Sequence, residues 1–409
     1  MTRVVVTGYG GITALGSRWE DIEGALRAGR NAVRRMPEWD YFEMLNGRLA
    51  CPVEDFAPPP HWPRKQLRSM GRVAQLSLRA TEHALAHAAL DVTAGDPGDI
   101  GVAYGSSSGS IAPIQAFGVM VETGSMAGVT STSYIQMMPH TTAVNIGVHF
   151  GLQGRIIPTS SACTSGSQAI GYAYEAIRFG RTKVMLAGGA EELSGPGSAV
   201  FDTLYATSTR NDEPKLTPRP FDAARDGLVV GEGAATLVLE SLDHARARGA
   251  TILAEIIGFG CNTDGNHVTQ PTAATMARAM QLALNDAGLA PHAIDYISAH
   301  GTATDRGDIA ESEATASIFG GTVPISAMKS YLGHTLGACG AIEAWWAIEM
   351  MRRDWFAGTL NLDSPDPACA SLDHIAGADG RQLETQRIMS NNFAFGGINT
   401  SLIFQRFVD

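Results

Sequence analysis

One structural unit occurs twice along this chain of 409 residues, and it constrains the fold more than any other feature of the sequence. In the first half, a strand-like run ends at TSSAC, a turn of small residues follows, and a helical pattern covers 167–180. In the second half, the strand ends at SAMKSYLGH, the turn is LGACG, and the helical pattern covers 341–353. Two copies of strand, tight turn and long helix indicate an internal duplication. The duplication places Cys163 and the Lys329/His334 pair at related positions.

Strand-like runs alternate with helical patterns along the whole chain. Strands are expected at 4–10, 100–107, 155–162, 183–190, 235–240, 253–260, 294–301, 323–329 and 401–407, and helices at 19–29, 72–89, 167–180, 276–288 and 341–353. Such alternation is typical of an α/β fold. We therefore expect an α/β protein of two related halves, residues 1–250 and residues 251–409.

The charge and composition exclude several classes of function. The formal net charge of −11 argues against general nucleic-acid binding, which needs a basic face. Charged residues are only 17% of the chain, which indicates much buried area or a large subunit interface. Residues 123–174 carry one charge, Arg155, and are too rich in Thr, Ser, Gly and Asn to span a bilayer as a helix. We expect this segment to be the buried middle of the protein, next to a subunit interface.

The cysteines and the N-terminus indicate a cytoplasmic protein. The five cysteines (51, 163, 261, 339 and 369) form no CxxC pair and no metal-binding spacing. An odd, scattered set of this kind is typical of reduced thiols in the cytoplasm. The first residues, MTRVVVTGYGG, enter a strand-like run directly and show no signal-peptide pattern.

Cys163 is the first candidate for chemistry. It lies between a strand and a helix, in PTSSACTSGSQAIG. A thiol at a helix N-terminus feels the positive end of the helix dipole, so we expect its pKa to be lowered. We also expect a strained turn that exposes the sulfur, as in a nucleophile elbow. A buried structural cysteine is the alternative, and the small residues on both sides of Cys163 argue against it.

Two histidines follow strand ends, where α/β folds place their ligands. His300 lies in ISAHGTATDRGD, and His334 lies in KSYLGHTLGACG. A thiol and two imidazoles can support carbon–carbon bond formation, because the sulfur can hold an acyl group while neutral N–H groups stabilise an enolate. Lys329 precedes His334 by five residues, and a buried ammonium there could tune both histidines.

A third motif, NNFAFGGINTSL, covers 391–402. Phe395 is followed by Gly396 and Gly397, so its ring could gate a cavity from a mobile hinge. A plain glycine turn before the last strand is the alternative.

Together these motifs resemble the elongating condensing enzymes of the thiolase superfamily. TSSACTSG, AHGTATDRGD, KSYLGHTLGACGAIE and NNFAFGGINTSL occur in the order and spacing of the β-ketoacyl-acyl carrier protein synthases I and II. The segments STRNDEP, RPFDAARDGLVVGEGA and HARARGA also match that group. The resemblance covers essentially the whole chain. It implies a thiolase-like, five-layer αβαβα fold of two duplicated halves.

The resemblance also implies an activity and roles for individual residues. The expected reaction is the decarboxylative Claisen condensation of malonyl-acyl carrier protein with an acyl group held on Cys163, in fatty-acid elongation or in polyene or polyketide synthesis. His300 and His334 match the pair that promotes decarboxylation, and Lys329 matches the lysine that supports them. Phe395 matches the gating phenylalanine, and its backbone N–H, with that of Cys163, matches the oxyanion hole.

Further features of the family concern substrate and partners. Thr302 and Thr304 match threonines along the phosphopantetheine arm, and Glu343 matches a buried glutamate of structural character. No metal or cofactor is expected beyond the phosphopantetheine of an acyl carrier protein, which is the expected partner. The protein is expected to act as a homodimer, or as a heterodimer with a related subunit.

Three departures from the family pattern bear on specificity and gating. Ala394 and Ile398 stand where the family commonly has Gly and Thr, so the sequence does not decide whether the Phe395 gate can move. Ser108 stands where long-chain synthases carry a bulky apolar residue at the far end of the acyl pocket. That exchange predicts a deeper pocket and a longer or more rigid acyl group.

Docking of an acidic carrier protein needs a local basic patch, because the chain itself is acidic. Arg64, Arg68 and Arg72 recur every four residues, which places them on one face if 64–72 is helical. Lys65 flanks them, and Arg210 lies in STRNDEP. These residues are the candidate docking patch, and an ordinary solvated helix face is the alternative.

Several other functions compete with this interpretation. A non-decarboxylating thiolase needs a second catalytic cysteine late in the chain, but Cys369 lies in a loop-like segment. A chain-length factor lacks the nucleophile, and a papain-like hydrolase needs only one histidine motif. TGYGGIT (7–13) lacks the third glycine of a dinucleotide fingerprint and predicts a plain glycine loop. A specialised ketosynthase of an aryl polyene or polyketide pathway, working with a partner subunit, stays open.

Overall fold

The computed structural model describes residues 1–94 and 96–408. Its dominant feature is a sheet in which each half of the chain contributes the same arrangement of strands. The first half has the order β5-β4-β6-β8-β1, and the second half has the order β11-β10-β15-β16-β9. In each half the first three strands are parallel, and the next two join antiparallel.

The strands of the first half are β1 (Val4–Thr13), β4 (Ile100–Gly105), β5 (Ile156–Thr159), β6 (Val184–Glu191) and β8 (Gly233–Ser241). Those of the second half are β9 (Ala254–Thr263), β10 (Tyr296–Ser298), β11 (Pro324–Ser326), β15 (Arg387–Ala394) and β16 (Ile398–Gln405), with β13 (Asp373–His374) at the outer edge. A short antiparallel ladder between β1 and β9 joins the two halves.

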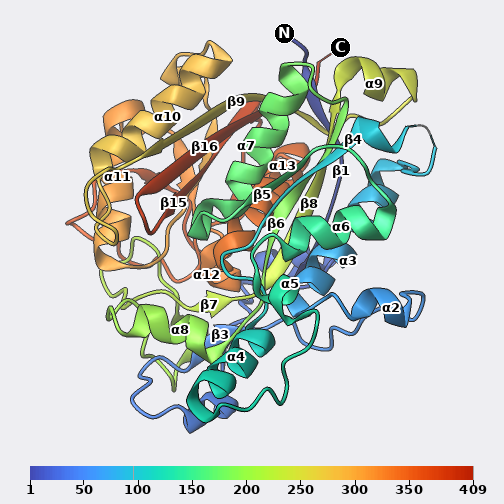
Figure 1. The fold of residues 1–409 in the computed structure, drawn as a ribbon. Helices are drawn as coiled ribbons and strands as arrows, with labels where there is room; N and C mark the ends of the chain where they lie inside the picture. The colour runs from blue at the N-terminus through green and yellow to red at the C-terminus, as the bar shows by residue number, and fades with distance from the viewer. Residues whose placement is uncertain (95, 409) are drawn as a thin grey trace.

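Helices cover both faces of each half-sheet, which gives five layers (Figure 1). The central layer is formed by α7 (Ser165–Arg178) and α13 (Cys339–Arg353), which pack on each other between the half-sheets. Outside the first half lie α3 (Arg72–Ala88) and α6 (Thr141–Phe150). Outside the second half lie α10 (Ala273–Ala287) and α11 (Asp305–Phe319). The predicted αβαβα fold of two duplicated halves is confirmed, and the predicted division at residue 250 falls in the loop that precedes β9.

The two central helices begin in the same way. A 3-10 turn, Ala162–Thr164, precedes α7, and a second one, Leu336–Ala338, precedes α13. The first residue of each turn has a left-handed backbone, with φ of 49° at Ala162 and 47° at Leu336. This conformation is costly for a residue with a side chain, so the surrounding structure must hold it. Its recurrence at matched positions supports the duplication that the sequence predicts.

Gly8 and Gly10 lie inside β1, so the loop predicted at 7–13 is wrong. A Cβ atom at Gly8 would lie 2.6 Å from the Ala84 carbonyl oxygen, and one at Gly10 would lie 2.5 Å from the Ala84 nitrogen. The glycines therefore let α3 pack directly on the strand backbone.

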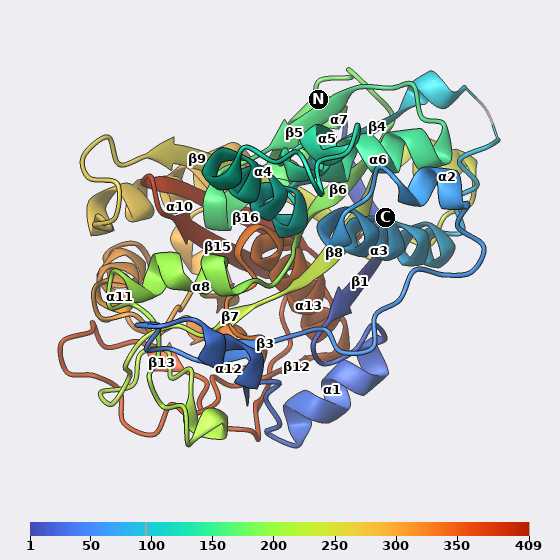
Figure 2. The same cartoon turned by 60° about the horizontal axis from the view of Figure 1, so that its bottom comes forward.

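Two further predictions are wrong. Residues 64–72 do not form one helix, because α2 (Arg64–Leu67) ends and α3 begins only at Arg72, after Gly71. The segment 123–174 is not buried throughout. α4 (Ile111–Thr123), α5 (Ser133–Met137) and the residues between them lie largely exposed outside the layers (Figure 2).

The remaining elements are α1 (Trp19–Arg27), β2 (Arg34–Arg35), β3 (Leu49–Cys51), α8 (Gly195–Asp202), β7 (Val230–Gly231), α9 (Leu242–Ala247), α12 (Lys329–Leu332), β12 (Trp355–Phe356) and β14 (Arg381–Gln382). Across the described residues, no helix combines the length and the apolar character that crossing a membrane requires.

Candidate active site

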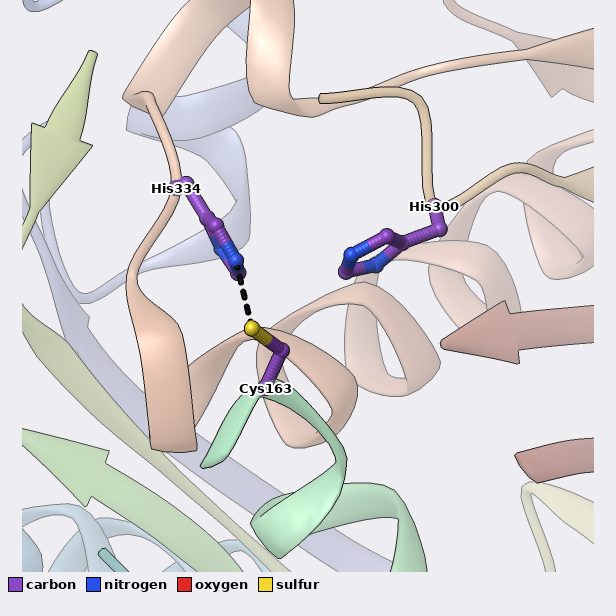
Figure 3. A group of neighbouring side chains, drawn as sticks. All are labelled: Cys163, His300 and His334. Carbon is purple, nitrogen blue, oxygen red and sulfur yellow. Dashed lines mark hydrogen bonds between the residues drawn. The ribbon is translucent and has the colours of Figure 1, made fainter. Parts of the chain in front are cut away.

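Cys163, His300 and His334 are buried and lie next to one another, although they are far apart in sequence (Figure 3). Cys163 lies in the turn before α7, His300 follows β10, and His334 lies in the loop between α12 and α13. The Nε2 atom of His334 is 2.9 Å from the Cys163 sulfur. The two imidazole rings meet edge to face, with centroids 5.2 Å apart. All three side chains line one cavity of about 560 Å³.

Hydrogen bonds to the far side of each ring fix which nitrogen carries the proton. The Lys329 ammonium lies 3.2 Å from Nδ1 of His300 and can only donate to it. The backbone N–H of Leu336 donates to Nδ1 of His334 at 3.3 Å. Burial, followed by the charge of Lys329, holds the pKa of both histidines well below the usual value, so both rings are neutral. We infer that each ring carries its proton on Nε2, where it can donate into the cavity.

Lys329 is held by an ion pair inside the protein. Its ammonium bonds to the carboxylate of Glu343 on α13, and both side chains are almost completely buried. Asn392 on β15 donates to the same carboxylate at 2.7 Å. Burial acts to lower the pKa of Lys329, but the acidic groups beside it, among them the Glu343 carboxylate to which it bonds, outweigh burial, so the net shift is upward. The ammonium therefore stays charged beside His300.

The thiol of Cys163 differs from the prediction in two respects. It is only 5% exposed, and burial raises its pKa to about 11, so the expected lowering by the helix dipole is wrong. The dipole is a local effect, whereas the loss of solvent around the sulfur depends on the whole fold. The charge of Lys329 and the backbone N–H groups of Phe395 and Cys163 oppose the effect of burial. These are the two N–H groups that match the family's oxyanion hole, and the structure brings both to the sulfur.

Phe395 lies beside the site, directly after β15. Its half-buried ring packs on Phe201 with centroids 5.4 Å apart, and Phe201 in turn faces His334. The N–H of Gly396 donates to the Val268 carbonyl at 2.7 Å, so the Phe395 loop is tied to the loop that precedes α10. Movement of the Phe395 ring, and the effect of Ala394 on it, stay predictions.

Thr302 and Thr304 line the same cavity, in the loop between His300 and α11. Their hydroxyl groups lie 2.9 Å apart and hydrogen bond to each other. The carboxylate of Glu311 on α11 accepts the N–H groups of His300 and Gly301, both at 2.7 Å. This contact fixes the backbone that carries His300.

Family comparisons match both halves of the chain. Residues 1–245 match the Beta-ketoacyl synthase, N-terminal domain, and residues 253–363 match the Beta-ketoacyl synthase, C-terminal domain. The chain belongs to the β-ketoacyl synthase family. It is therefore a condensing enzyme of the acyltransferase type, as its motifs predict.

Individual relatives agree with this assignment. A 3-oxoacyl-[acyl-carrier-protein] synthase 2 of Coxiella burnetii (strain RSA 493 / Nine Mile phase I) is 35% identical, over 100% of this chain and 99% of the relative. The crystal structure of a β-ketoacyl synthase from Burkholderia phymatum STM815 is 69% identical with a TM-score of 0.98, over 100% of both chains. The ishigamide ketosynthase/chain length factor structure is 31% identical with a TM-score of 0.91, again over 100% of both chains.

The structure of this β-ketoacyl synthase does not bring every predicted residue to the site. Ser108 is exposed, and it does not line the cavity that contains Cys163 in the described single chain. Arg68 is exposed and is not part of the cavity lining, whereas Arg210 bonds to Asp226 at 3.4 Å and to the Ala224 carbonyl at 2.9 Å. Arg72 pairs with the buried Glu232, so it does not share an exposed face with Arg68.

A second thiol lies near the site, and the sequence analysis gives it no role there. Cys339 begins α13, and its sulfur donates to the Cys163 carbonyl at 3.2 Å. Neither Cys339 nor Cys369 lines the cavity, so neither is placed as a thiolase-type second nucleophile. Asn392, Glu311 and Glu191 are not predicted either: Asn392 and Glu191 meet partners 49 and 146 positions away, and Glu311 lies in a helix that the sequence does not predict.

The three central side chains also have the geometry of possible metal ligands. The sulfur of Cys163 and one nitrogen from each histidine lie within 4.8 Å of one another. However, the Lys329 ammonium lies 3.2 Å from His300 Nδ1, and its positive charge opposes a divalent cation there. The arrangement suits an acyl group and an enolate better than a metal ion.

Proposed function

We propose that this β-ketoacyl synthase extends an acyl chain held on Cys163 by decarboxylative condensation with a malonyl thioester, both substrates arriving on an acyl carrier protein. The observation that carries the proposal is the meeting of one thiol and two neutral Nε2–H donors in a single cavity.

In the first half-reaction, the Cys163 sulfur attacks the carbonyl carbon of the acyl thioester. We assign the backbone N–H groups of Cys163 and Phe395 to the oxyanion that forms, because both approach the Cys163 sulfur where the carbonyl group would bind. The carbon–sulfur bond to the carrier breaks, and the thiol proton of Cys163 ends on the released carrier thiol. The buried charge of Lys329 favours the thiolate during the attack.

In the second half-reaction, the malonyl thioester loses its carboxylate as CO₂ and becomes an enolate. Nε2–H groups of His300 and His334 can donate to the enolate oxygen, where negative charge develops. The enolate carbon attacks the acyl group on Cys163, and a 3-oxoacyl thioester leaves on the carrier. The Cys163 thiolate then takes up a proton, so the reaction balances without a redox cofactor or a metal.

The carrier arm and its protein require two further surfaces. We assign Thr302 and Thr304 to the arm, because their hydroxyl groups line the cavity that leads to the histidines. We assign docking to Arg64, Lys65 and Arg68, which are exposed on and beside α2. Arg210 contributes less, because Asp226 already neutralises its charge.

A second subunit is proposed to cover α4, α5 and the outer edge of β5. Apolar side chains are exposed there: Ile114, Val119, Val121, Met126, Tyr134 and Ile156. β5 is the last strand of the sheet, and a free sheet edge with apolar surroundings is normally covered. The partner is a second copy of this chain or a related subunit, such as the chain length factor named with the ketosynthase in the ishigamide structure.

The same face holds Ser108, which keeps its predicted role only if the partner closes an acyl pocket over it. Two kinds of acyl substrate therefore fit the proposal: those of ordinary fatty-acid elongation and those of a specialised polyene or polyketide pathway. The five cysteines are all free thiols, which supports a reducing, cytoplasmic setting.

The test is reconstitution. The purified protein is incubated with hexanoyl-acyl carrier protein and malonyl-acyl carrier protein, and the carrier is analysed by intact mass spectrometry. The expected product is the 3-oxooctanoyl carrier, absent with Cys163→Ala. Carrier that stays unextended across saturated and polyenoic acyl groups, alone and with candidate partner subunits, would contradict the proposal.

A further inference from the structure

Glu191 is a buried carboxylate next to the active site that the mechanism above does not use. It is the last residue of β6, is 1% exposed, and does not line the cavity. One of its oxygens accepts two backbone N–H groups, from Ser107 at 3.0 Å and from Gly337 at 2.9 Å. Ser107 belongs to the first half of the chain and Gly337 to the second, so the carboxylate joins the two halves.

Gly337 lies in the turn that determines the state of His334. The preceding residue, Leu336, donates its N–H to Nδ1 of His334 at 3.3 Å. That contact keeps the ring proton on Nε2, which faces Cys163. Leu336 has a left-handed backbone with φ of 47°, a conformation that persists only where its surroundings hold it.

The packing around Gly337 leaves the turn no freedom to shift toward Glu191. A Cβ atom added there would lie 2.8 Å from the Glu191 carboxylate oxygen and 2.8 Å from the Ser107 nitrogen. The carboxylate thus reaches the turn at the place where only a glycine fits.

We propose that Glu191 is a positioning residue, which anchors the Leu336–Ala338 turn to the first half of the chain so that Leu336 keeps His334 as an Nε2–H donor aimed at Cys163. The proposal rests on the proposed condensation, in which that donor serves enolate formation. Glu191 acts because its side chain is long enough for one oxygen to accept both N–H groups. Its negative charge matters less than this length, which is called its reach below.

Two substitutions separate reach from charge. Glu191→Gln removes the charge but keeps an oxygen that can accept both N–H groups, and Ser107 can accept the new amide protons through its hydroxyl. Glu191→Asp keeps the carboxyl group but withdraws its oxygen by one methylene. The matched control is Glu192→Asp, because Glu192 is the next residue and also anchors backbone N–H groups, those of Val73 and Ile111, neither of which belongs to the Leu336–Ala338 turn.

Two measurements follow for each variant. The first is the tautomer of His334, read by nitrogen-15 NMR of protein labelled at its histidines and assigned with His334→Gln. The second is the rate of malonyl-carrier decarboxylation, compared with the rate of acyl transfer to Cys163.

We expect Glu191→Asp to add an Nδ1–H population at His334 and to slow decarboxylation up to about 100-fold, the size of effect that a misplacement of about 1 Å can cause. Acyl transfer should fall much less, and Glu191→Gln and Glu192→Asp should stay near the unsubstituted protein in both measurements.

An unchanged His334 tautomer in Glu191→Asp overturns the inference. So does a Glu191→Gln variant as impaired as Glu191→Asp, because charge would then outweigh reach. The tautomer is read without turnover, so a protein that failed to condense any substrate would contradict the proposed function while leaving this measurement able to decide the inference.

Discussion

Lys329→Met is the most informative single change at the buried ion pair. Lys329 and Glu343 have side chains that are 1% and 2% exposed, so the methionine would leave a carboxylate without its cation in the protein interior. Removing one partner of a buried pair costs about 3–5 kcal/mol. At about 2.1 cal/mol/K of unfolding entropy per residue, that loss lowers the melting temperature of a chain of this length by about 4–6 °C.

The same change acts on catalysis, because it removes the donor that holds the proton of His300 on Nε2. Decarboxylation of malonyl-carrier should fall by about 100-fold or more, the cost of losing one well-placed donor to a developing oxyanion. Differential scanning fluorimetry measures the first effect, and release of labelled CO₂ measures the second. The matched control is Lys183→Met, which breaks the exposed ion pair with Asp99 and should leave the melting temperature almost unchanged.

The stability loss should also depend on pH. Burial already raises the pKa of Glu343, and loss of the ammonium raises it further, so the folded variant binds a proton that the unfolded chain releases. Folding of Lys329→Met is therefore favoured by acid. The difference in melting temperature between the variant and the unsubstituted protein should shrink as pH falls. If Lys329→Met had the same melting temperature as the Lys183→Met control and decarboxylated malonyl-carrier at the normal rate, the reasoning would be refuted.

Three further predictions follow from the site and the docking patch. His300→Ala and His334→Ala should each block decarboxylation while partly sparing acylation of Cys163, and near-normal condensation by both variants would show that the assigned roles are wrong. Arg68→Glu should raise KM for carrier-bound substrates at low salt, with the effect fading as salt rises. Arg278→Glu, the same charge change at an exposed position of α10, should leave KM unchanged. Alkylation of Cys163, followed by peptide mapping, should keep accelerating from pH 7 to beyond pH 9, because a thiol whose pKa is raised to about 11 gains thiolate throughout that range. A plateau near pH 8 would contradict the raised pKa.

The sequence predicts the strand–turn–helix units and the residues at their ends, because both depend on local patterns. TSSACTSG and KSYLGHTLGACG place Cys163 and His334 beside the two central helices, as the structure does. α11 was missed, because its sequence DRGDIAESEATASIF is too polar to show an apolar face. The helix predicted over 64–72 is interrupted before Arg72, because Gly71 has an extended backbone despite the regular spacing of the arginines.

What could not be predicted depends on contacts between distant segments. Asn392 meets Glu343 across 49 positions, and Glu191 meets Gly337 across 146 positions. The pKa of Cys163 also depends on distant contacts. The helix that follows Cys163 can be predicted from the sequence, but the burial that outweighs its dipole cannot. Exposure of Ser108 and of α4 likewise reflects a single chain, and a partner subunit would change it.

The most direct test of the central claim follows the acyl group through both half-reactions. The protein is mixed with hexanoyl-acyl carrier protein, digested and mapped by mass spectrometry, and a second portion is chased with malonyl-acyl carrier protein while CO₂ is counted. The account predicts one hexanoyl group on Cys163, discharged by the chase with one CO₂ per 3-oxoacyl carrier formed. An acyl group on another residue, or discharge without CO₂, would contradict it.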